Sequence, residues 1–234
     1  VEAVRDGLAL TYFEYGTLAA LVVFAAAELD VWVLEVGLGG RLDATNAVDP
    51  TAALITSIAL DHCDWLGDDV ESIAAEKAGV MRSGIPVVLG GCEVPQAILN
   101  QAEKCGARLL LRDRDFKLDG VPTPGLPGEF QRGNAAAVLA LLNAAGLPEA
   151  ANLELAESIL PTVQLSGRGQ RVEHDGVEWL LDVAHNPAAA EVLTGVLQED
   201  KAGKTTAIIG MLDDKDVAGL VLPLDPNIDR WIAV

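Results

Sequence analysis

Short apolar segments alternate with helix-like segments along the chain, and this alternation constrains the fold more than any other feature of the sequence. Short continuous apolar runs are typical of strands that are buried on both faces, as in parallel sheets. Strands that alternate with helices predict an α/β fold with mostly parallel sheets. In the first part of the chain we expect strands at residues 31–34, 52–58, 86–89 and 108–111, and helices at 17–28, 69–78 and 95–104.

The second part of the chain continues the alternation after a loop rich in glycine and proline at residues 113–130. Asp175-Gly176 is a turn signal between two strand-like runs and predicts a β-hairpin. We place a domain boundary near Ser166, which gives domains at residues 1–166 and 167–234. The elements expected here are helices at 134–145, 153–160, 187–197 and 215–220, and strands at 170–173, 178–183, 205–209 and 230–234.

Composition argues against several classes of function. Lys and Arg total 16 against 35 Asp and Glu, which gives a formal net charge of −19, and nucleic-acid binding requires clustered cations instead. The longest apolar run, residues 17–27, is shorter than the roughly 20 residues that cross a bilayer, so we expect a buried helix and no membrane partner. Three cysteines without a CxxC pair predict neither a disulfide framework nor a zinc knuckle. With no signal-peptide pattern at the first residues, these features favour the cytoplasm.

Candidate ligand-binding residues follow two of the expected strands. Ligands of parallel sheets bind outside the carboxyl ends of the strands. Glu35 follows the first expected strand and His62 follows the second, so the two side chains would converge at one sheet edge and could hold a divalent metal. A strand-end carboxylate and a structural histidine are the alternatives for each residue taken alone.

Lys77 and a glycine-rich segment are weaker candidates. Asp68 is expected as the N-cap of the helix at 69–78, with Glu71 in capping-box spacing and Gly79 as the stop. Lys77 would then lie in the last turn, where the helix dipole favours any lysine. The glycines within residues 37–40 would let the backbone approach a ligand closely, or would only form a tight turn.

The tripeptide Gly203-Lys204-Thr205 looks like the end of a phosphate-binding P-loop but does not fit the pattern. A P-loop needs a glycine five positions earlier, where this chain has Gln198. It also follows a strand and opens a helix, whereas these residues open the apolar strand expected at 205–209. We therefore expect no P-loop here.

Several segments in order together resemble one known family. They are residues 11–17 (TYFEYGT), 34–46 (LEVGLGGRLDATN), 56–62 (TSIALDH), 76–79 (EKAG) and 182–187 (DVAHNP). These segments are similar to the bacterial bifunctional dihydrofolate synthase/folylpolyglutamate synthases of the muramyl-ligase superfamily, which are ATP-dependent amide ligases. The resemblance implies a central ATPase domain of the muramyl-ligase type, without its P-loop part, followed by a truncated Rossmann-like C-terminal domain for glutamate ligation.

The resemblance also implies roles at matching positions. Glu35 and His62 would be ligands of Mg²⁺, and Lys77 would be the catalytic lysine that the family carries as a carbamate. Residues of the ATP site would be Asn134, Arg168 and Asp182. Residues of the pterin-substrate site would be Thr11, Tyr12, Phe13, Glu14, Leu42, Asp43 and Ala44.

The chain also departs from the family pattern. The family's P-loop and first substrate loop have no counterpart in it, so we expect a fragment that does not turn over alone. The chain begins with Val1, and residues 229–234 look like a strand cut in mid-fold. The Arg168 assignment has a competitor in Arg171, because the family often has an aromatic residue where this chain has Gly169.

The expected reaction joins L-glutamate to dihydropteroate or a folate through an acyl phosphate formed from ATP, by a monomeric enzyme. Two other readings remain open. One is another muramyl-ligase superfamily enzyme, such as a muramyl-peptide or cyanophycin-type synthetase; the other is an inactive nucleotide-binding module. The segment at 11–16 favours the folate branch.

Overall fold

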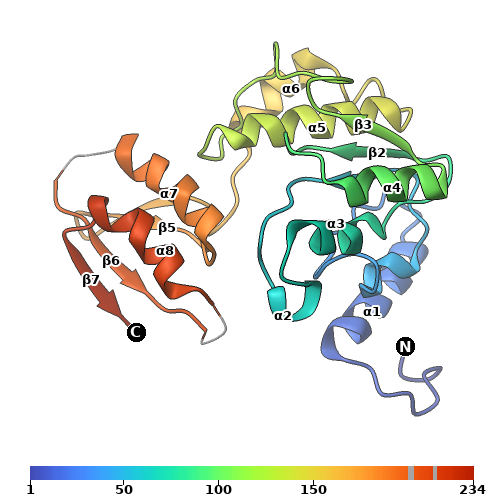
Figure 1. The fold of residues 1–234 in the computed structure, drawn as a ribbon, viewed down its shortest axis with the longest axis horizontal. Helices are drawn as coiled ribbons and strands as arrows, with labels where there is room; N and C mark the ends of the chain where they lie inside the picture. Colours follow the sequence, from blue (N-terminus) through green and yellow to red (C-terminus); the bar gives the residue numbers. More distant parts are fainter. Residues whose placement is uncertain (200–202, 213–214) are drawn as a thin grey trace. The chain divides into compact units, whose positions relative to one another are not determined.

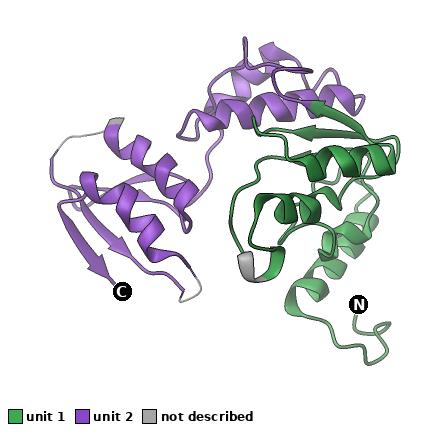
Figure 2. Ribbon diagram, viewed as in Figure 1, with its two compact units in different colours: residues 1–110 green, residues 111–234 purple. Residues whose placement is uncertain are grey.

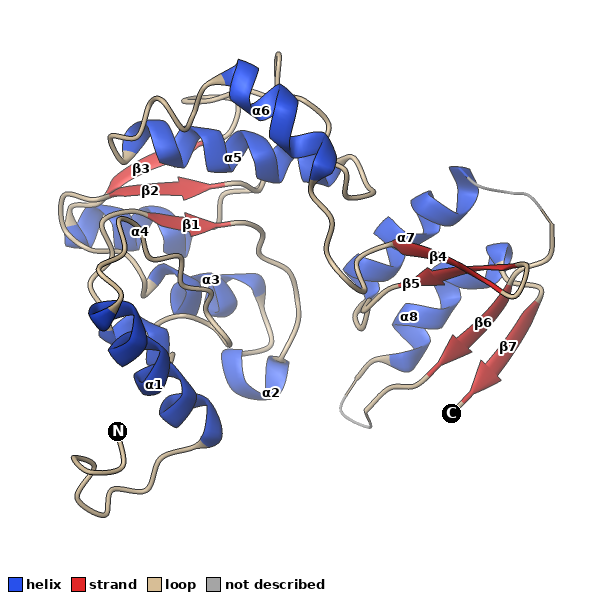
Figure 3. Cartoon of the chain, turned by 180° about the vertical axis from the view of Figure 1, so that it is seen from behind, coloured by secondary structure: helices blue, strands red, loops and turns tan. Residues whose placement is uncertain are grey.

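The computed structural model describes residues 1–199, 203–212 and 215–234. The chain forms two compact units, residues 1–110 and residues 111–234 (Figure 2). Both units combine helices with short strands, which confirms the predicted α/β class (Figure 1 and Figure 3). These two units do not test the domain boundary expected near Ser166, which stays a prediction. No helix among the described residues is both long and apolar enough to cross a bilayer.

Unit 1 is built around a three-stranded sheet with the order β1-β2-β3. β1 runs parallel to β2, with Ala53 opposite Val87 and Ile55 opposite Leu89. The strands are β1 (Ala53–Ile55), β2 (Pro86–Leu89) and β3 (Arg108–Leu111), the last of which ends at the first residue of unit 2. The helices are α1 (Tyr12–Ala26), α2 (Cys63–Leu66), α3 (Val70–Ala78) and α4 (Gln96–Cys105), with a 3-10 turn η1 at Ala44–Ala47.

The core of unit 1 lies at β2 and at the contact between α3 and α4. Val87, Val88 and Leu89 of β2 are fully buried, as the continuous apolar run predicted. Ile73 of α3 and Ile98 of α4 are buried as well. Each such side chain stabilises the fold by about 1.5–3 kcal/mol relative to an exposed position, so this cluster fixes the position of α3.

The start of α3 lies one residue beyond the prediction. Asp69, not Asp68, is the N-cap, and its carboxylate accepts a hydrogen bond from the Ser72 N–H at 2.9 Å. Glu71 does not close a capping box. Its carboxylate accepts the N–H groups of Gln96 and Ala97 at 2.9 and 2.7 Å and so caps α4. The first N–H groups of a helix need acceptors, and here a neighbouring helix supplies one.

Two expectations for the first part of the chain are wrong. Residues 31–34 form no strand, and Val31 and Val33 are 52% and 86% exposed. The helix expected to be buried has formed as α1, but none of its residues is buried. A parallel strand needs a hydrogen-bonded neighbour and an all-round apolar helix needs a covering surface. The described residues supply neither.

Unit 2 contains two further small sheets and several helices. Strands β4 (Gln170–His174) and β5 (Val177–Leu181) form an antiparallel hairpin, and β6 (Thr206–Ile209) runs parallel to β7 (Arg230–Ala233). Asp175 and Gly176 both have positive φ, as the predicted two-residue hairpin turn requires. The helices are α5 (Phe130–Ala144), α6 (Leu153–Ile159), α7 (Pro187–Glu199) and α8 (Val217–Leu224), with 3-10 turns η2 (Leu160–Thr162) and η3 (Asp225–Asn227).

Small apolar residues pack the helices of unit 2. Ala135 and Ala136 of α5 are buried with Val121 in one cluster. Ala190 of α7 is buried with Leu220 of α8 in a second cluster, and the two helices lie side by side in both views (Figure 1 and Figure 3). The segment at residues 203–205 leads into strand β6 and opens no helix, which confirms that it is not a P-loop.

Candidate functional site

Lys77 lies in the last turn of α3 with its side chain about half-buried. Burial lowers the pKa of Lys77 because it disfavours the ammonium form, while the negative charge of Asp61 raises the pKa and opposes this effect in part. The net pKa is lowered. An ordinary helix-end lysine extends into solvent, so its burial separates Lys77 from that alternative.

His62 follows Asp61 directly and has an unusual backbone conformation. Its φ is +52°, in the left-handed region that residues other than glycine rarely adopt. The His62 N–H donates to Oδ1 of Asp61 at 2.8 Å, and the imidazole is partly exposed. Such conformations cost free energy, and they cluster at functional sites. This geometry agrees with a functional role for His62 more than with a purely structural one.

Glu35 is exposed and lies in an extended segment that forms no strand. We expected Glu35 and His62 to meet because each follows a strand of one sheet. The first of those strands is absent from the described residues, so sheet topology does not bring the two residues together. The role of the pair as metal ligands stays a prediction. It rests on the motifs rather than on sheet topology.

Asp43 organises the glycine-rich segment through both carboxylate oxygens. Oδ2 accepts the N–H groups of Gly37 and Leu38, each at 3.0 Å, and Oδ1 accepts the N–H and hydroxyl of Thr45 at 2.9 and 2.6 Å. Partial burial acts to raise the pKa of Asp43, but the hydrogen bonds outweigh it and the pKa is lowered. The carboxylate is thus held ionised, and it fixes the turn that leads into Ala44 and η1.

Phe13 of α1 packs against this same loop. A Cβ atom added at Gly37 would lie 2.7 Å from the Phe13 ring, closer than side-chain packing permits. Gly37 is therefore needed for the close approach, and the structure brings Phe13, Gly37 and Asp43 together. Two predicted substrate residues, Phe13 and Asp43, meet here from segments that are distant in sequence.

The remaining predicted substrate residues have mixed environments. Thr11 and Glu14 form the capping box of α1: the Glu14 carboxylate accepts the Thr11 N–H at 2.7 Å and the Thr11 hydroxyl at 2.8 Å. These hydrogen bonds, led by that of the Thr11 backbone, lower the pKa of Glu14. Tyr12 and Leu42 are 96% and 79% exposed. Single exposed apolar side chains are common on protein surfaces, so the substrate role of Tyr12 and Leu42 stays a prediction.

The glycine-rich loop also packs directly onto the end of α3. A Cβ atom at Gly40 would lie 2.9 Å from the Glu76 carbonyl oxygen, and one at Gly79 would lie 2.3 Å from the Arg41 Cβ. The Arg41 N–H donates to that carbonyl at 2.9 Å, and the Arg41 guanidinium binds the Glu76 carboxylate through two nitrogens. These contacts hold the loop beside the turn of α3 that carries Lys77.

The predicted nucleotide residues all lie in unit 2. Asn134 is in α5, and its amide donates to the Gln131 side chain at 3.1 Å. Asp182 accepts the Gly169 N–H at 2.7 Å and the Ala184 N–H at 2.8 Å. The structure therefore brings the loop of Arg168 next to Asp182.

Arg171, the competitor of Arg168, is engaged in the β-hairpin. Its guanidinium pairs with the Glu178 carboxylate of the facing strand. Arg168 is exposed in the turn that precedes β4. This difference favours Arg168 as the residue that a ligand would meet.

Two residues with many contacts in the loop were missed by sequence reasoning. Asn46 lies in the segment at residues 34–46 that carries the resemblance, which implies no role for it, and no motif contains Arg82. Both hold the loop against α3 through hydrogen bonds to residues 33–36 positions away. An asparagine at the end of a glycine-rich segment was the only available signal for Asn46.

Comparisons with known proteins confirm the resemblance. Residues 167–234 match the family described as Mur ligase, glutamate ligase domain. The chain is 46% identical over 99% of its length to the dihydrofolate synthase/folylpolyglutamate synthase of Escherichia coli (strain K12), and 42% identical over 96% to that of Haemophilus influenzae. It covers 57% and 58% of these relatives, so it spans little more than half of their length.

Solved structures agree. An Escherichia coli FolC in complex with DHPP and ADP is similar with a TM-score of 0.88 at 44% identity, over 98% of this chain and 58% of that one. A bifunctional folylpolyglutamate synthase/dihydrofolate synthase with Mn, AMPPNP and L-glutamate bound has a TM-score of 0.87 at 46% identity, with the same coverage.

Proposed function

We propose that this chain is the part of an ATP-dependent glutamate ligase that carries most of the reaction site. Its likeness to the dihydrofolate synthase/folylpolyglutamate synthases is confirmed along its length. The observation that supports this most directly is the packing of the glycine-rich loop onto the turn of α3 that contains the half-buried Lys77. A relative that is 46% identical to this chain is solved with Mn, AMPPNP and L-glutamate bound.

The proposed reaction has two steps. A carboxylate of dihydropteroate or of a folate attacks the γ-phosphoryl group of ATP, which gives an acyl phosphate and ADP. The amine of L-glutamate then attacks the acyl carbon, inorganic phosphate leaves, and the amine loses a proton as the amide forms. The protein's part in such a reaction is to position the groups and stabilise charge.

The donor set fits a divalent cation. Glu35 offers an exposed carboxylate and His62 a partly exposed imidazole, and carboxylate and imidazole groups are metal ligands in proteins. We propose that Glu35 and His62 hold Mg²⁺, which would neutralise charge on the transferring phosphoryl group when bound. The left-handed backbone conformation of His62 sets the direction in which its side chain leaves the backbone.

Lys77 is proposed to act as a carbamate. Only a neutral amine adds carbon dioxide, and the burial that lowers the pKa of Lys77 favours the neutral form. The product is an anion. It could accept hydrogen bonds from groups around the cation and orient them.

The other side chains divide between two ligands. We propose that the loop and α1 contact the pterin substrate, since the structure packs Phe13 against the Asp43 loop. Substrate residues on α1 are Thr11, Tyr12, Phe13 and Glu14, and those on the loop are Leu42, Asp43 and Ala44. ATP would be contacted by Asn134, Arg168 and Asp182 of unit 2.

The proposal includes a cellular setting. We expect the protein in the cytoplasm as a monomer, with dihydropteroate or folates, L-glutamate and ATP as its ligands. We expect no nucleic-acid or membrane partner, because the net charge of −19 repels phosphate surfaces. The same field also repels ATP, so a bound cation is needed on electrostatic grounds.

The proposed function is tested by substrate dependence. The complete protein that carries this chain should release phosphate from ATP when a pterin substrate and L-glutamate are both present, and only slowly when either is omitted. Dihydropteroate and tetrahydrofolate are tested separately to assign the two synthase activities. Turnover with a muramyl nucleotide and no response to pterins would show another ligase of the superfamily. Nucleotide binding without turnover on any of these substrates would show an inactive module.

A further inference from the structure

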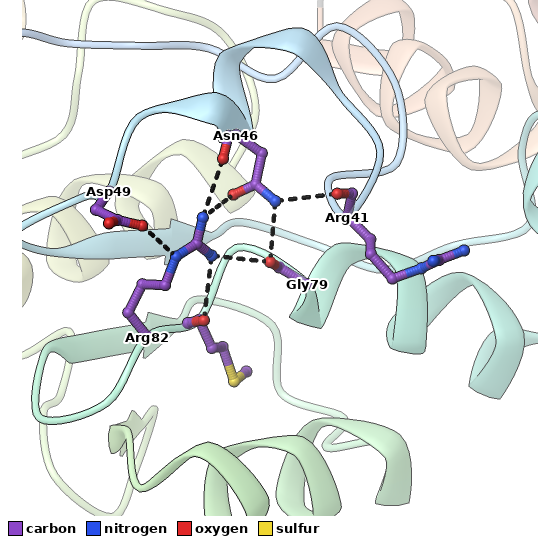
Figure 4. Close-up of polar contacts among 6 residues, drawn as sticks. Arg41, Asn46, Asp49, Gly79 and Arg82 are labelled. Carbon is purple, nitrogen blue, oxygen red and sulfur yellow. Dashed lines mark hydrogen bonds and ion pairs between the residues drawn. The ribbon is translucent and has the colours of Figure 1, made fainter.

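Asn46 links three parts of unit 1 through a single side-chain amide (Figure 4). Its Nδ2 donates to the carbonyl oxygens of Arg41 and Gly79, each at 3.1 Å, and its Oδ1 accepts from Arg82 at 3.0 Å. The first carbonyl belongs to the glycine-rich loop and the second to the C-terminal end of α3. One side-chain amide therefore makes hydrogen bonds to the loop, to the end of α3 and to Arg82.

Arg82 completes this arrangement from the segment that follows α3. Its guanidinium donates to Asn46 O and Oδ1 at 3.0 Å, to Gly79 O at 3.1 Å and to Met81 O at 3.2 Å, and Nε pairs with Asp49 at 2.7 Å. The Arg82 side chain is 28% exposed, whereas Asp49 is 87% exposed. The partly buried hydrogen bonds to carbonyl groups therefore outweigh the surface ion pair in ordering the loop.

The packing of the backbone shows why this arrangement holds Lys77 as well. Gly79 accepts from both Asn46 and Arg82, and it lies two residues after Lys77. The Cβ that Gly79 lacks would overlap Arg41. A shift of the loop would thus move the last turn of α3, and a shift of that turn would move the loop.

We infer that Asn46 and Arg82, with their partners Arg41, Asp49 and Gly79, form a clamp. The clamp holds the substrate loop and the Lys77 turn as one rigid body. The inference rests on the proposed function, since it assigns to the clamp the positioning of the pterin substrate against the reacting groups. Neither Asn46 nor Arg82 needs to touch a ligand in this role. They are positioning residues.

The shape of the guanidinium, rather than its charge, carries the clamp. The two terminal nitrogens of Arg82 donate to four acceptors, and its Nε pairs with Asp49. A lysine ammonium is a point charge without this planar fork. Arg82→Lys therefore keeps the attraction to Asp49 and loses most of the carbonyl contacts. Asn46→Asp keeps the acceptor for Arg82 and removes both donations to carbonyls.

The test compares Arg82→Lys and Asn46→Asp with wild type in the complete protein, by steady-state kinetics for each substrate. Small displacements of reacting groups cost up to about 100-fold in rate. We expect kcat/KM for the pterin substrate to fall by about tenfold or more in each variant, with KM for ATP changed less than about twofold. Arg114→Lys is the matched control, because Arg114 is 58% exposed and pairs with its neighbour Asp115; it should retain wild-type kinetics.

A double variant separates a shared device from two independent structural effects. Asn46→Asp with Arg82→Lys should lose clearly less than the product of the two single losses, because residues of one network are not additive. Near wild-type kinetics in Arg82→Lys would overturn the inference, as would equal losses for ATP and pterin or multiplicative losses in the double variant.

Amide hydrogen exchange tests whether the clamp exists without relying on enzyme activity. The Arg41 N–H donates to Glu76 O and the Met81 N–H to Ala78 O, so the two report on the loop and on the end of α3. Arg82→Lys should speed exchange at both. Faster exchange at Met81 with Arg41 unchanged would overturn the inference even if the wild type ligates glutamate. A wild type that does not ligate glutamate would instead refute the proposed function and leave exchange to decide the clamp.

Discussion

Asp61 places a negative charge near the Lys77 ammonium, yet burial of Lys77 has the larger effect and lowers the pKa of this lysine. A surface ion pair would have the opposite result, because the carboxylate alone raises the pKa of a lysine. The end of α3 therefore holds an amine whose neutral form is more populated than that of an exposed lysine. This is the form that reacts with carbon dioxide.

Lys77 should take up carbon dioxide while an exposed helix-end lysine does not. With labelled bicarbonate and Mg²⁺ at constant pH, a carbamate signal is expected for Lys77 in the complete protein. Lys104 is the matched control, because it lies in the last turn of α4 and is exposed. Lys77→Ala should lose the signal and the activity, and short carboxylic acids should restore part of the activity. If the enzyme is fully active while Lys77 is unmodified, the carbamate proposal is wrong and Lys77 is an ordinary helix-end lysine.

Glu35→Gln and His62→Asn should each reduce ligase activity at least about 100-fold, which is about 2.7 kcal/mol in the activation free energy. Asparagine is chosen because it tolerates the left-handed backbone of His62 better than alanine, and His62→Ala is expected to lose activity as well. Folding should survive, since both side chains are exposed or partly exposed. His174→Asn at the exposed tip of the hairpin is the control. Activity of both variants within a few-fold of wild type would exclude the pair from the site.

Asp43→Asn should destabilise the protein in a pH-dependent way. An amide offers one acceptor oxygen in place of two, so N–H groups of Gly37 and Leu38 or of Thr45 lose a partner, at about 1–2 kcal/mol. The pKa of Asp43 is lowered from 3.8, so its contribution is complete above that pH and is lost as pH falls through the folded-state pKa. Urea unfolding between neutral pH and acid measures this. Asp68→Asn, at an exposed position, should change stability little at neutral pH, and an Asp43→Asn difference that persists undiminished in acid would contradict the assignment.

Gly79→Ala should lower the free energy of unfolding by about 1–3 kcal/mol, because the added Cβ overlaps Arg41 in a packed contact. The φ of Gly79 is −62°, which alanine adopts easily, so any loss reports packing rather than backbone strain. Gly16→Ala in α1 is the matched control. Its added Cβ meets nothing within 4 Å, so a gain of up to about 1 kcal/mol is expected. Equal effects of the two substitutions in thermal unfolding would refute the close approach.

Local signals in the sequence were sufficient for most elements. The Asp175-Gly176 turn, the buried β2 run and the stop of α3 at Gly79 depend on residues that are neighbours along the chain, and the structure confirms them. The motifs were sufficient for the family as well. Conformational preference and burial pattern act over a few residues, so a reader of the sequence can evaluate them directly.

Tertiary structure decided what the sequence left open. The capping of α4 by Glu71, the burial of Lys77 and the contacts of Arg82 with Asn46 and Asp49 join residues 25–36 positions apart or depend on packing around a whole helix. The lack of buried residues in α1 and the exposure of residues 31–33 have the same origin, because an apolar segment is buried only where a second surface covers it. Residue types determine which groups prefer burial or a hydrogen bond, and the path of the chain determines which partner each group meets.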